Sequence, residues 1–288
     1  MLNLIHARTF LAVIEERGFR PAARKLALSP STAMEHIRQL EADLAAPLLV
    51  RLRGQVEPTR QGAVLEPLAR ALVATAERAR ELIAKAPLRV AACSNVGCYS
   101  LLPIFARFNN ACGIAIEPWI GANLAVADRL SQGLADVAVM EWWDGRPGFE
   151  AKLWRREPLK VIVAPSHPWA TRTSIMPTEL IGARVLGGEV GSGTGTVLRR
   201  QLGEIARRMS TIDGFGSTEA VKRAVRAGHG ISIVLASTIA DEIAGGSLVA
   251  LDIEGTTVEK DISLICARGL LETSSSARLI AFMQDHPS

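Results

Sequence analysis

The sequence predicts a small, mostly α-helical domain, a connecting helix, and a larger two-lobed α/β domain. Three observations support this fold class. Residues 1–58 hold short helical patterns and one hairpin pattern, residues 59–86 hold one long helical pattern, and strand and helix patterns alternate over residues 87–288. A chain of 288 residues is long enough for two or three domains with a substantial core.

Composition favours a soluble globular protein, because 48% of the residues are hydrophobic and 22% are charged. No run of 18 apolar residues exists, so no membrane span and no membrane partner are expected. The first residues lack a signal-peptide cleavage site, which favours a cytoplasmic location. Four cysteines in that compartment need no disulfide, although Cys93 and Cys98 are close enough for a redox pair as well as for simple packing.

Charge is distributed unevenly along the chain. Residues 1–86 carry 13 Lys and Arg against 9 Asp and Glu, whereas residues 87–288 carry 20 of each. The whole positive excess therefore lies in the first part, which favours a polyanionic partner at that end.

The stretch "AARKLALSPSTAMEHIRQLE" (22–41) holds two helical patterns with a tight connection. Ser29 is a good N-cap and Pro30 stands at the first helical position, where its missing N–H costs nothing. The second helix has an apolar face of Ala33, Ile37, Leu40 and Leu44 and an opposite face of Ser31, Thr32, Glu35 and Arg38, with Met34 at its edge. This pattern indicates a helix-turn-helix whose polar face can enter a DNA major groove, although a plain helical hairpin has the same spacing.

The next segment, "APLLVRLRGQVEPTRQG" (46–62), predicts two short strands joined by a turn at Gly54. Arg51, Arg53 and Arg60 flank this hairpin, where the wing of a winged helix presents phosphate contacts. The hairpin favours a winged helix-turn-helix over a helical hairpin.

The order of "GF", "AARKLALS", "IRQLEADL", "PLLVR" and "PTRQG" resembles the DNA-binding domain of LysR-type transcriptional regulators. Pro30, Ser31, Met34, Glu35 and Pro58 depart from the family pattern, so Glu35 either accepts from a cytosine amine or repels phosphate, and Met34 can touch a thymine methyl. The predicted contacts to double-stranded DNA are Ser29, Pro30, Ser31, Thr32, Met34, Glu35, Arg38, Arg51 and Arg53.

Residues 59–86 predict a connecting helix that ends before Pro87 and contains Pro67. Its apolar seam recurs at alternating spacings of three and four, as in a short coiled coil, through Leu65, Leu68, Leu72, Thr75, Ala79 and Leu82. The resemblance implies that this helix dimerises the chain, and a homotetramer is expected from paired dimers. A two-fold dimer with two reading heads requires a near-palindromic operator.

Residues 87–288 show a βαβαβ rhythm typical of a parallel sheet covered by helices, then a pair of strands over 151–165 and a second α/β unit with one helix from Gly193 to Met209. We expect lobe I at 87–163 and 267–288 and lobe II at 164–266, with a cleft between them. This part resembles the LysR-type effector domain, which implies a fold like that of type-II periplasmic binding proteins.

Two turns are candidates for the cleft. "CSNVGCYS" follows the first strand, where the backbone N–H groups of Val96, Gly97 and Cys98 and the Ser94 hydroxyl can point at a ligand, and "GEVGSGTGT" is glycine-rich around Gly191 and Gly193. Tight turning alone also explains these glycines. The resemblance implies contacts from Ser94, Asn95, Asn123, Glu141, Ser192 and Thr194.

Glu141 and Trp142 in "VMEWWDG" are proposed to recognise a hydrogen-bond-donating or cationic end of the effector. The alternative is that Glu141 pairs with an Arg and that the tryptophans are core or lobe-contact residues.

The sequence holds no catalytic, zinc, P-loop or dinucleotide signature, so neither an enzyme nor a cofactor or metal is expected. An α/β enzyme would leave the basic head unexplained, and a solute-binding protein would need an export signal. The predicted function is a DNA-binding transcriptional regulator modulated by a small-molecule effector between the lobes. The alternative within this fold is a redox-responsive regulator that uses Cys93 and Cys98.

Overall fold

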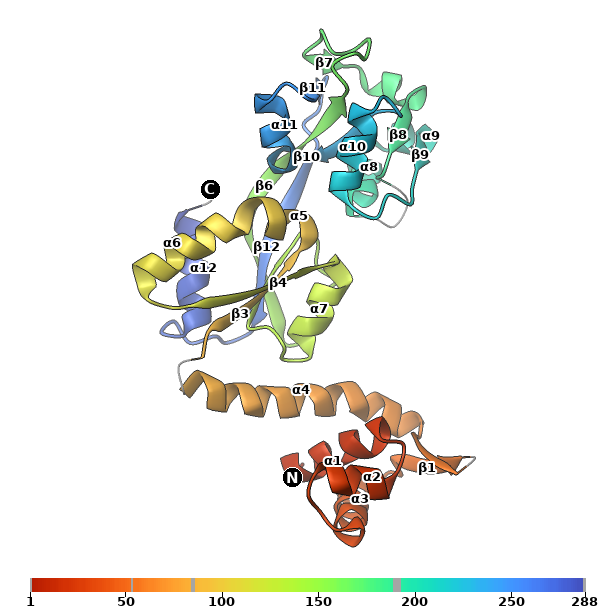
Figure 1. Cartoon of the computed structure of the whole chain (residues 1–288), viewed down its shortest axis with the longest axis vertical. Helices are drawn as coiled ribbons and strands as arrows, with labels where there is room; N and C mark the ends of the chain where they lie inside the picture. The colour runs from red at the N-terminus through yellow and green to blue at the C-terminus, as the bar shows by residue number, and fades with distance from the viewer. Residues whose placement is uncertain (1, 53, 84–85, 189–192, 287–288) are drawn as a thin grey trace. The chain divides into compact units, whose positions relative to one another are not determined.

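The computed structural model describes residues 2–52, 54–83, 86–188 and 193–286. It divides the chain into two compact units, which are described separately (Figure 1). The first comprises residues 1–89 and 127–136, and the second comprises residues 90–126 and 137–288. Within the described ranges no helix is both long and apolar enough to cross a bilayer.

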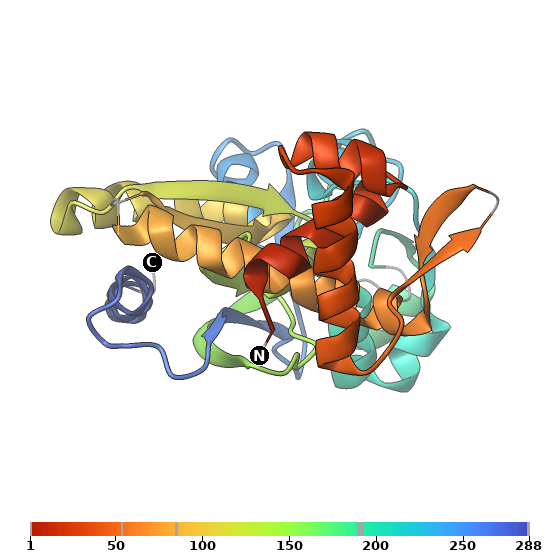
Figure 2. The ribbon, with the colours of Figure 1, turned by 90° about the horizontal axis from the view of Figure 1, so that it is seen from below.

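The first unit begins with three helices packed around one apolar core. They are α1 (Leu4–Glu15), α2 (Phe19–Lys25) and α3 (Pro30–Leu44). Phe10 and Leu40 are fully buried between them. A hairpin of β1 (Leu49–Leu52) and β2 (Gln55–Pro58) follows and stands out from the helices (Figure 2). The predicted winged helix-turn-helix is therefore present.

Local chemistry fixes where α3 begins and ends. The Ser29 hydroxyl accepts a hydrogen bond from the Thr32 N–H at 3.0 Å, and Pro30 occupies the first turn. Ala45 ends the helix in the left-handed region at φ 51°. The sequence-based helix start is confirmed.

The connecting helix α4 (Arg60–Ile83) carries Pro67 in its interior. Leu65, predicted on the dimer seam, is buried in the core of the three-helix head instead, because α4 packs against α1. Val64, Leu68 and Leu72 form the exposed apolar stripe, with exposures of 64%, 58% and 44%. The prediction for the Leu82 side chain lies outside the described residues.

The second unit is built on a mixed sheet rather than the parallel sheet predicted. The strand order is β4-β3-β5-β12-β6-β11-β7, and β10 pairs with β6. β3 and β5 are parallel, whereas β12 is antiparallel to both β5 and β6. The bounds are β3 (Leu88–Cys93), β4 (Ile116–Gly121), β5 (Val137–Met140), β6 (Phe149–Val163), β7 (Ser174–Ile175), β10 (Ser232–Leu235), β11 (Val249–Ile253) and β12 (Glu259–Ala267), with a separate parallel pair of β8 (Arg184–Leu186) and β9 (Ser210–Ile212).

Two long antiparallel strands, β6 and β12, run side by side through both lobes (Figure 1). β6 is one strand of 15 residues where the sequence predicted a pair. Ser263–Cys266 of β12 pair with β5, while Glu259 at the other end pairs with Pro158. The lobe boundaries stay a prediction, since each crossover strand belongs to both lobes.

Helices cover both lobes. In lobe I these are α5 (Ser94–Val96), the π-turn η1 (Gly97–Leu101), α6 (Leu102–Cys112), α7 (Asn123–Ser131) and α12 (Ser275–Asp285). In lobe II they are η2 (Pro177–Ile181), α8 (Gly193–Leu202), α9 (Glu204–Arg208), α10 (Thr218–Arg226), η3 (Ala236–Ile239) and α11 (Ala240–Ala244). The single helix predicted over 193–209 is broken at Gly203, whose φ of +54° stops α8.

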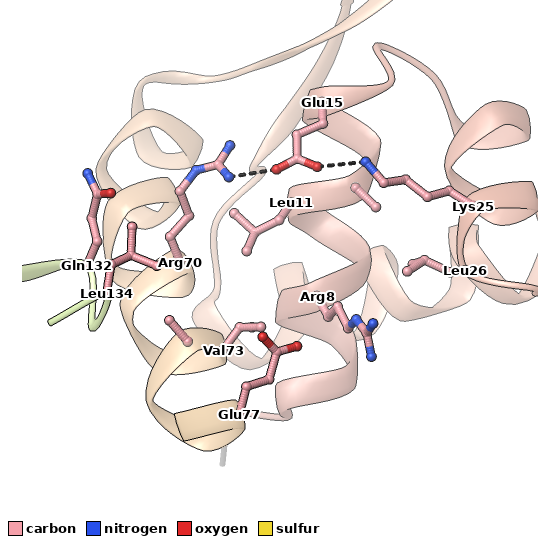
Figure 3. Close-up of a pocket in the computed structure, with 12 residues that line it drawn as sticks. Arg8, Leu11, Glu15, Lys25, Leu26, Arg70, Val73, Glu77, Gln132 and Leu134 are labelled. Carbon is pink, nitrogen blue, oxygen red and sulfur yellow. Dashed lines mark hydrogen bonds and ion pairs between the residues drawn. The ribbon is translucent and has the colours of Figure 1, made fainter. Parts of the chain in front are cut away.

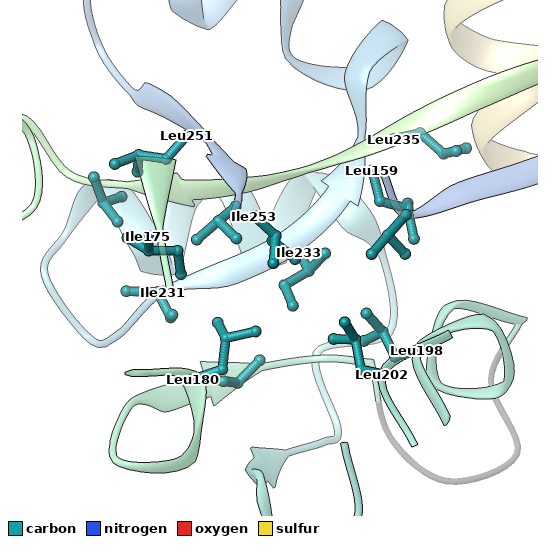
Figure 4. Close-up of a cluster of buried hydrophobic side chains, with 14 residues drawn as sticks. Leu159, Ile175, Leu180, Leu198, Leu202, Ile231, Ile233, Leu235, Leu251 and Ile253 are labelled. Atoms are coloured by element: carbon teal, nitrogen blue, oxygen red, sulfur yellow. The ribbon is translucent and has the colours of Figure 1, made fainter. Parts of the chain in front are cut away.

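Each lobe has its own apolar core. In lobe II, β-branched and leucine side chains from the strands meet α8 and η2, as Figure 4 shows for Ile233, Leu198 and Leu180. In lobe I, α6 and α12 meet through an edge-to-face contact of Phe108 and Phe282 with ring centres 5.4 Å apart. The cores hold the two lobes as packed bodies on the β6–β12 pair.

Candidate functional site

The outer face of α3 carries the residues predicted to contact DNA. Ser29, Pro30, Ser31 and Arg38 are exposed, Thr32 is half-buried, and Met34 is 57% exposed. The Ser29 hydroxyl lies 2.7 Å from the Ser31 hydroxyl and 2.8 Å from that of Thr32, so these three groups form one polar cluster at the helix start. The surface can donate and accept hydrogen bonds within a groove.

Glu35 is bound within the protein rather than left free. Its carboxylate accepts from Arg38 Nε at 2.8 Å and Nη2 at 2.7 Å, and from Gln39 Nε2 at 2.8 Å. These bonds, first of all those from Arg38, lower the pKa of Glu35 to about 2. Glu35 therefore stays ionised, and it holds the Arg38 guanidinium in place on the outer face of α3.

The hairpin presents Arg51 as an exposed side chain. Its partner in the prediction, Arg53, lies outside the described residues. The hairpin is anchored to the helices by a hydrogen bond from the Val56 N–H to the Arg17 carbonyl at 3.0 Å. Arg51 is therefore presented from a strand tied to the head.

α1 and α3 also meet through two histidines. The rings of His6 and His36 stack with centres 4.8 Å apart, and the Thr9 hydroxyl lies 2.9 Å from His36 Nδ1. Burial, followed by the neighbouring His6, lowers the pKa of His36. The contact between the two helices therefore favours a neutral imidazole.

A cavity of about 510 Å³ lies between α1, α2 and α4 in the first unit (Figure 3). Glu15 stands at its edge and accepts from Arg70 at 2.6 Å and from Lys25 at 3.0 Å. Arg70, first of all, lowers the pKa of Glu15. The cavity is thus crossed by ion pairs that join the head to its connecting helix.

The far part of α4 is fixed by Arg78. This side chain is 5% exposed and donates to both carboxylate oxygens of Asp136, at 2.9 and 2.6 Å, and to the Pro87 carbonyl at 2.6 Å. Asp136 also accepts from the Arg89 N–H at 2.8 Å. A buried, bidentate pair of this kind holds α4 to the chain just before β5.

In the second unit, a cavity of about 270 Å³ lies between the lobes. Its described lining is Asn95, Glu141, Gly187, Gly188, Gly193, Thr194, Phe215, Gly216, Ser217, Thr218, Val221 and Lys260. α8 begins at Gly193 and α10 begins at Thr218, so the N-terminal turns of two helices border the same space. A helix N-terminus favours an acceptor or an anion nearby, and the hydroxyls of Thr194 and Thr218 stand there already bonded to Lys260 and Asn95.

A buried ion pair of Glu141 and Lys260 forms one wall of this interlobe cavity. Their side chains are 10% and 2% exposed. Lys260 Nζ also lies 3.0 Å from the Thr194 hydroxyl, and Asn95 Nδ2 donates to Glu141 at 3.1 Å. The alternative expected Glu141 to pair with an arginine, and the structure pairs it with a lysine of β12 instead.

Asn95 also links the lobes directly. The Thr218 hydroxyl donates to Asn95 Oδ1 at 2.7 Å. A second interlobe contact lies nearby, where Lys222 Nζ stands 4.7 Å from the centre of the Tyr99 ring. Lys222 is itself 4% exposed and bound to Glu242 at 2.6 Å. The lobes are therefore joined by polar contacts beside the cavity.

Other predicted effector residues serve different contacts. Ser94 donates to the Gly121 carbonyl at 3.0 Å, and Asn123 joins the Trp142 carbonyl, at 2.9 Å, to the Glu141 N–H, at 3.2 Å. Val96 and Gly97 are buried, and a Cβ on Gly97 would stand 2.8 Å from Ile120. Among the described residues, Ser94, Val96, Gly97, Cys98, Asn123 and Trp142 do not line the interlobe cavity. Gly191 and Ser192 lie outside the described residues.

The structure thus brings Asn95, Glu141, Gly193 and Thr194 together at this cavity. Lys260 and Thr218 also line this cavity but were not among the residues predicted from the sequence. Lys260 stands in a pattern of alternating charged and apolar residues, "EKDISLI", that predicts a strand with exposed charges, and Thr218 was counted only as part of a helix.

Cys93 is buried and donates to Glu141 at 3.5 Å. Burial, and then the Glu141 charge, raises the pKa of its thiol far above the usual range. Cys98 is exposed. A thiolate at Cys93 is strongly disfavoured, which weighs against the Cys93–Cys98 redox alternative.

Comparisons with known proteins cover nearly the whole chain. The family described as "Bacterial regulatory helix-turn-helix protein, lysR family" matches residues 4–63, and the "LysR substrate binding domain" matches residues 84–288. The chain is 37% identical to the putative HTH-type transcriptional regulator protein PtxE of Stutzerimonas stutzeri over 196 residues, which is 67% of this chain and 100% of that protein. It is 31% identical to the HTH-type transcriptional regulator CbbR of Xanthobacter flavus, covering 93% of this chain and 83% of that one.

Among solved structures, a full-length OxyR variant from Pseudomonas aeruginosa has a similar fold. The TM-score is 0.72 at 20% identity, over 99% of this chain and 95% of that chain. At this level of identity the likeness concerns the fold alone, so it adds nothing to the redox alternative.

Proposed function

Because the chain belongs to the LysR family of DNA-binding transcriptional regulators with an effector-binding domain, we propose that its effector binds in the interlobe cavity beside the Glu141–Lys260 pair. The observation that carries this proposal is the convergence of Asn95, Thr194, Thr218 and Lys260 on one small cavity. Effector binding would favour one arrangement of the lobes and thereby alter how the protein binds DNA.

The cavity chemistry suits a small polar effector with an acceptor or anionic group. The first turns of α8 and α10 supply N–H groups and hydroxyls, while the Lys260 charge is balanced by Glu141. A ligand anion would share Lys260 with Glu141, and a hydrogen-bond donor on the ligand would engage the Glu141 carboxylate. A volume of about 270 Å³ limits the effector to a small metabolite.

The test combines footprinting with variants of the cavity. The full-length protein would be footprinted on the DNA upstream of its own gene with and without a panel of small polar metabolites. A metabolite that changes the footprint would then be titrated against Thr218→Val and Glu141→Gln, with Thr257→Val outside the cavity as the matched control. We expect about tenfold weaker binding in the cavity variants only. Unchanged affinity in both would remove the site.

We propose that α3 reads base edges through Ser31, Thr32, Met34 and Arg38, and that Ser29, Pro30 and Glu35 position this face. Arg51 and Arg53 would contact phosphates from the wing. The exposure of the α3 face and the Glu35–Arg38 pairing support this assignment.

We also propose a homodimer, joined along the Val64–Leu68–Leu72 stripe of α4, and a tetramer of two dimers on a near-palindromic operator. The exposed apolar stripe supports the dimer. The family consists of transcriptional regulators rather than enzymes, so no catalytic residue, cofactor or metal site is proposed. Since the partner is chromosomal DNA, we place the protein in the cytoplasm.

A further inference from the structure

A second cavity, of about 560 Å³, lies next to the interlobe cavity. Its described lining is Glu141, Trp142, Trp143, Gly193, Thr196, Val197, Arg200, Asp261 and Ser263. Only Glu141 and Gly193 of these residues also line the interlobe cavity. The two spaces therefore have different chemistry and are separated by the Glu141 carboxylate and the start of α8.

Two indoles give the second cavity its apolar wall. Trp142 is 36% exposed, and its ring lies against the backbone of α8 because Gly193 has no side chain. A Cβ there would stand 3.2 Å from Trp142 Cδ1. Trp143 is held edge-on by Phe149, with ring centres 6.1 Å apart. Two indoles on one cavity wall offer a face on which a flat ring can stack.

The charges of this cavity do not cancel. Glu141 is neutralised by Lys260, and Asp261 is paired with Arg156 at 3.2 Å. Arg200 is exposed, and no described residue forms a hydrogen bond or ion pair with it. Among the described lining residues the Arg200 guanidinium therefore lacks a counter-charge, and its planar donors fit a carboxylate or phosphate.

The strand beneath the cavity is irregular at the same place. The register of β12 against β6 shifts between Ile262 and Ser263, and Ser263 lines the cavity. A bulge re-aims side chains and is common beside binding sites.

We propose that this second cavity is a binding site for an aromatic or heteroaromatic anion, distinct from the interlobe cavity lined by Asn95 and Thr218. The ring stacks on Trp142 and Trp143, and the anionic group pairs with Arg200. Glu141 faces both cavities, so a ligand in one changes the affinity for a ligand in the other, and the change is reciprocal.

The site is tested by calorimetric titration of the full-length protein with three probes. Indole-3-carboxylate has both the ring and the charge, indole lacks the charge, and cyclohexanecarboxylate lacks the aromatic ring. Indole-3-carboxylate is expected to bind at least about tenfold more tightly than either of the others. No binding of indole-3-carboxylate up to about 10 mM would overturn the proposal.

Variants locate the probe. Arg200→Gln and Trp142→Leu each weaken indole-3-carboxylate binding by about tenfold or more. Arg199→Gln is the matched control, because Arg199 precedes Arg200 on α8 but does not line the cavity. Equal affinity in the Arg199 and Arg200 variants overturns the proposal.

If the second cavity does not bind the aromatic probe, the proposed effector site in the interlobe cavity is not affected. Thr218→Val tests the interlobe cavity and is expected to leave indole-3-carboxylate binding unchanged, since Thr218 does not line the second cavity. A loss of this probe in Thr218→Val together with its retention in Arg200→Gln would place the aromatic anion in the interlobe cavity and overturn the proposal of a second site.

Discussion

At the scale of single residues, the most consequential group is Lys260. It is 2% exposed and has Glu141 as its counter-charge. Burial of both charges is costly, and the pair is retained only because each partner compensates the other. Residues that build a ligand site often carry such a cost.

We expect Lys260→Met to lower the free energy of unfolding by about 3–5 kcal/mol, because Glu141 is left buried and unpaired. Urea unfolding followed by tryptophan fluorescence measures this in the second unit, since all five tryptophans lie beyond residue 90. A Lys260→Met, Glu141→Leu double variant should recover most of the loss. Equal losses in the single and double variants would contradict the pairing argument.

Glu35→Gln is expected to strengthen binding to random duplex DNA. Arg38 is then released to contact phosphate, and a negative charge leaves the reading face. The slope of log affinity against log salt should steepen by up to about 0.9, the value for one added phosphate contact. Fluorescence anisotropy at several salt concentrations measures it, with Glu77→Gln on α4 as control. An unchanged slope would show that Arg38 already contacts phosphate in the wild type.

The order of residue types along the chain predicted some of the residues that line the interlobe cavity. Asn95 and Thr194 were predicted because they match the effector-contact pattern of LysR-type effector domains, and Glu141 was predicted also because it follows a buried strand. Ser94 and Asn123 fit the same pattern but bond to Gly121 and to the Trp142 loop. A sequence shows which groups can bond, and tertiary contacts decide which partner each group takes.

At the scale of elements, the residue at which a helix begins was predictable from the sequence, whereas the continuity of a long strand was not. Ser29 and Pro30 fix the start of α3 locally. The sequence predicted a pair of strands over 151–165, yet β6 runs through Pro158 as one strand. The missing N–H of Pro158 falls where pairing changes from β12, whose Glu259 lies opposite Pro158, to β10, whose last residue Leu235 lies opposite Leu159.

The α1–α3 contact should weaken in mild acid. The pKa of His36 is lowered in the folded state by burial, so the unfolded chain takes up a proton first, near its ordinary value of 6.5. Stability from this group is complete above that pH and falls as the pH drops through it toward the folded pKa.

Amide hydrogen exchange in α1 and α3 of the full-length protein tests this, after correction for the intrinsic rate. Between about pH 7.5 and 5.5 we expect the opening free energy to fall, and His36→Gln should remove the dependence. His286→Gln, at the residue that follows α12, is the control. An unchanged pH profile in His36→Gln would assign the effect to another group.

At the scale of the whole molecule, the sequence alone indicated DNA binding and effector binding, because the two functions belong to different segments of the chain. All of the formal charge of +4 lies in the first 86 residues, while the remaining residues are balanced. The apolar repeat of the connecting helix did not reveal that Leu65 packs into the core of the head. Apolar residues at spacings of three and four occur both in helices that pack in a core and in helices that form an interface.

Leu68→Asp should disrupt the dimer. A carboxylate in an apolar stripe must be desolvated on association, so sedimentation velocity is expected to show monomers. Loss of the second head should lower operator affinity by about a hundredfold or more. Leu271→Asp, at a site 74% exposed in the second unit, is the control. Dimers that persist in Leu68→Asp would move the interface elsewhere.

The contact between Tyr99 and Lys222 can report on lobe opening, because the two residues belong to opposite lobes. The chain has one tyrosine, and that ring sits against a cation from the opposite lobe. A single fluorotyrosine incorporated at this codon would give one NMR signal, whose chemical shift depends on the nearby ammonium group. Opening and closing of the lobes would then be visible in solution with no change at any other residue.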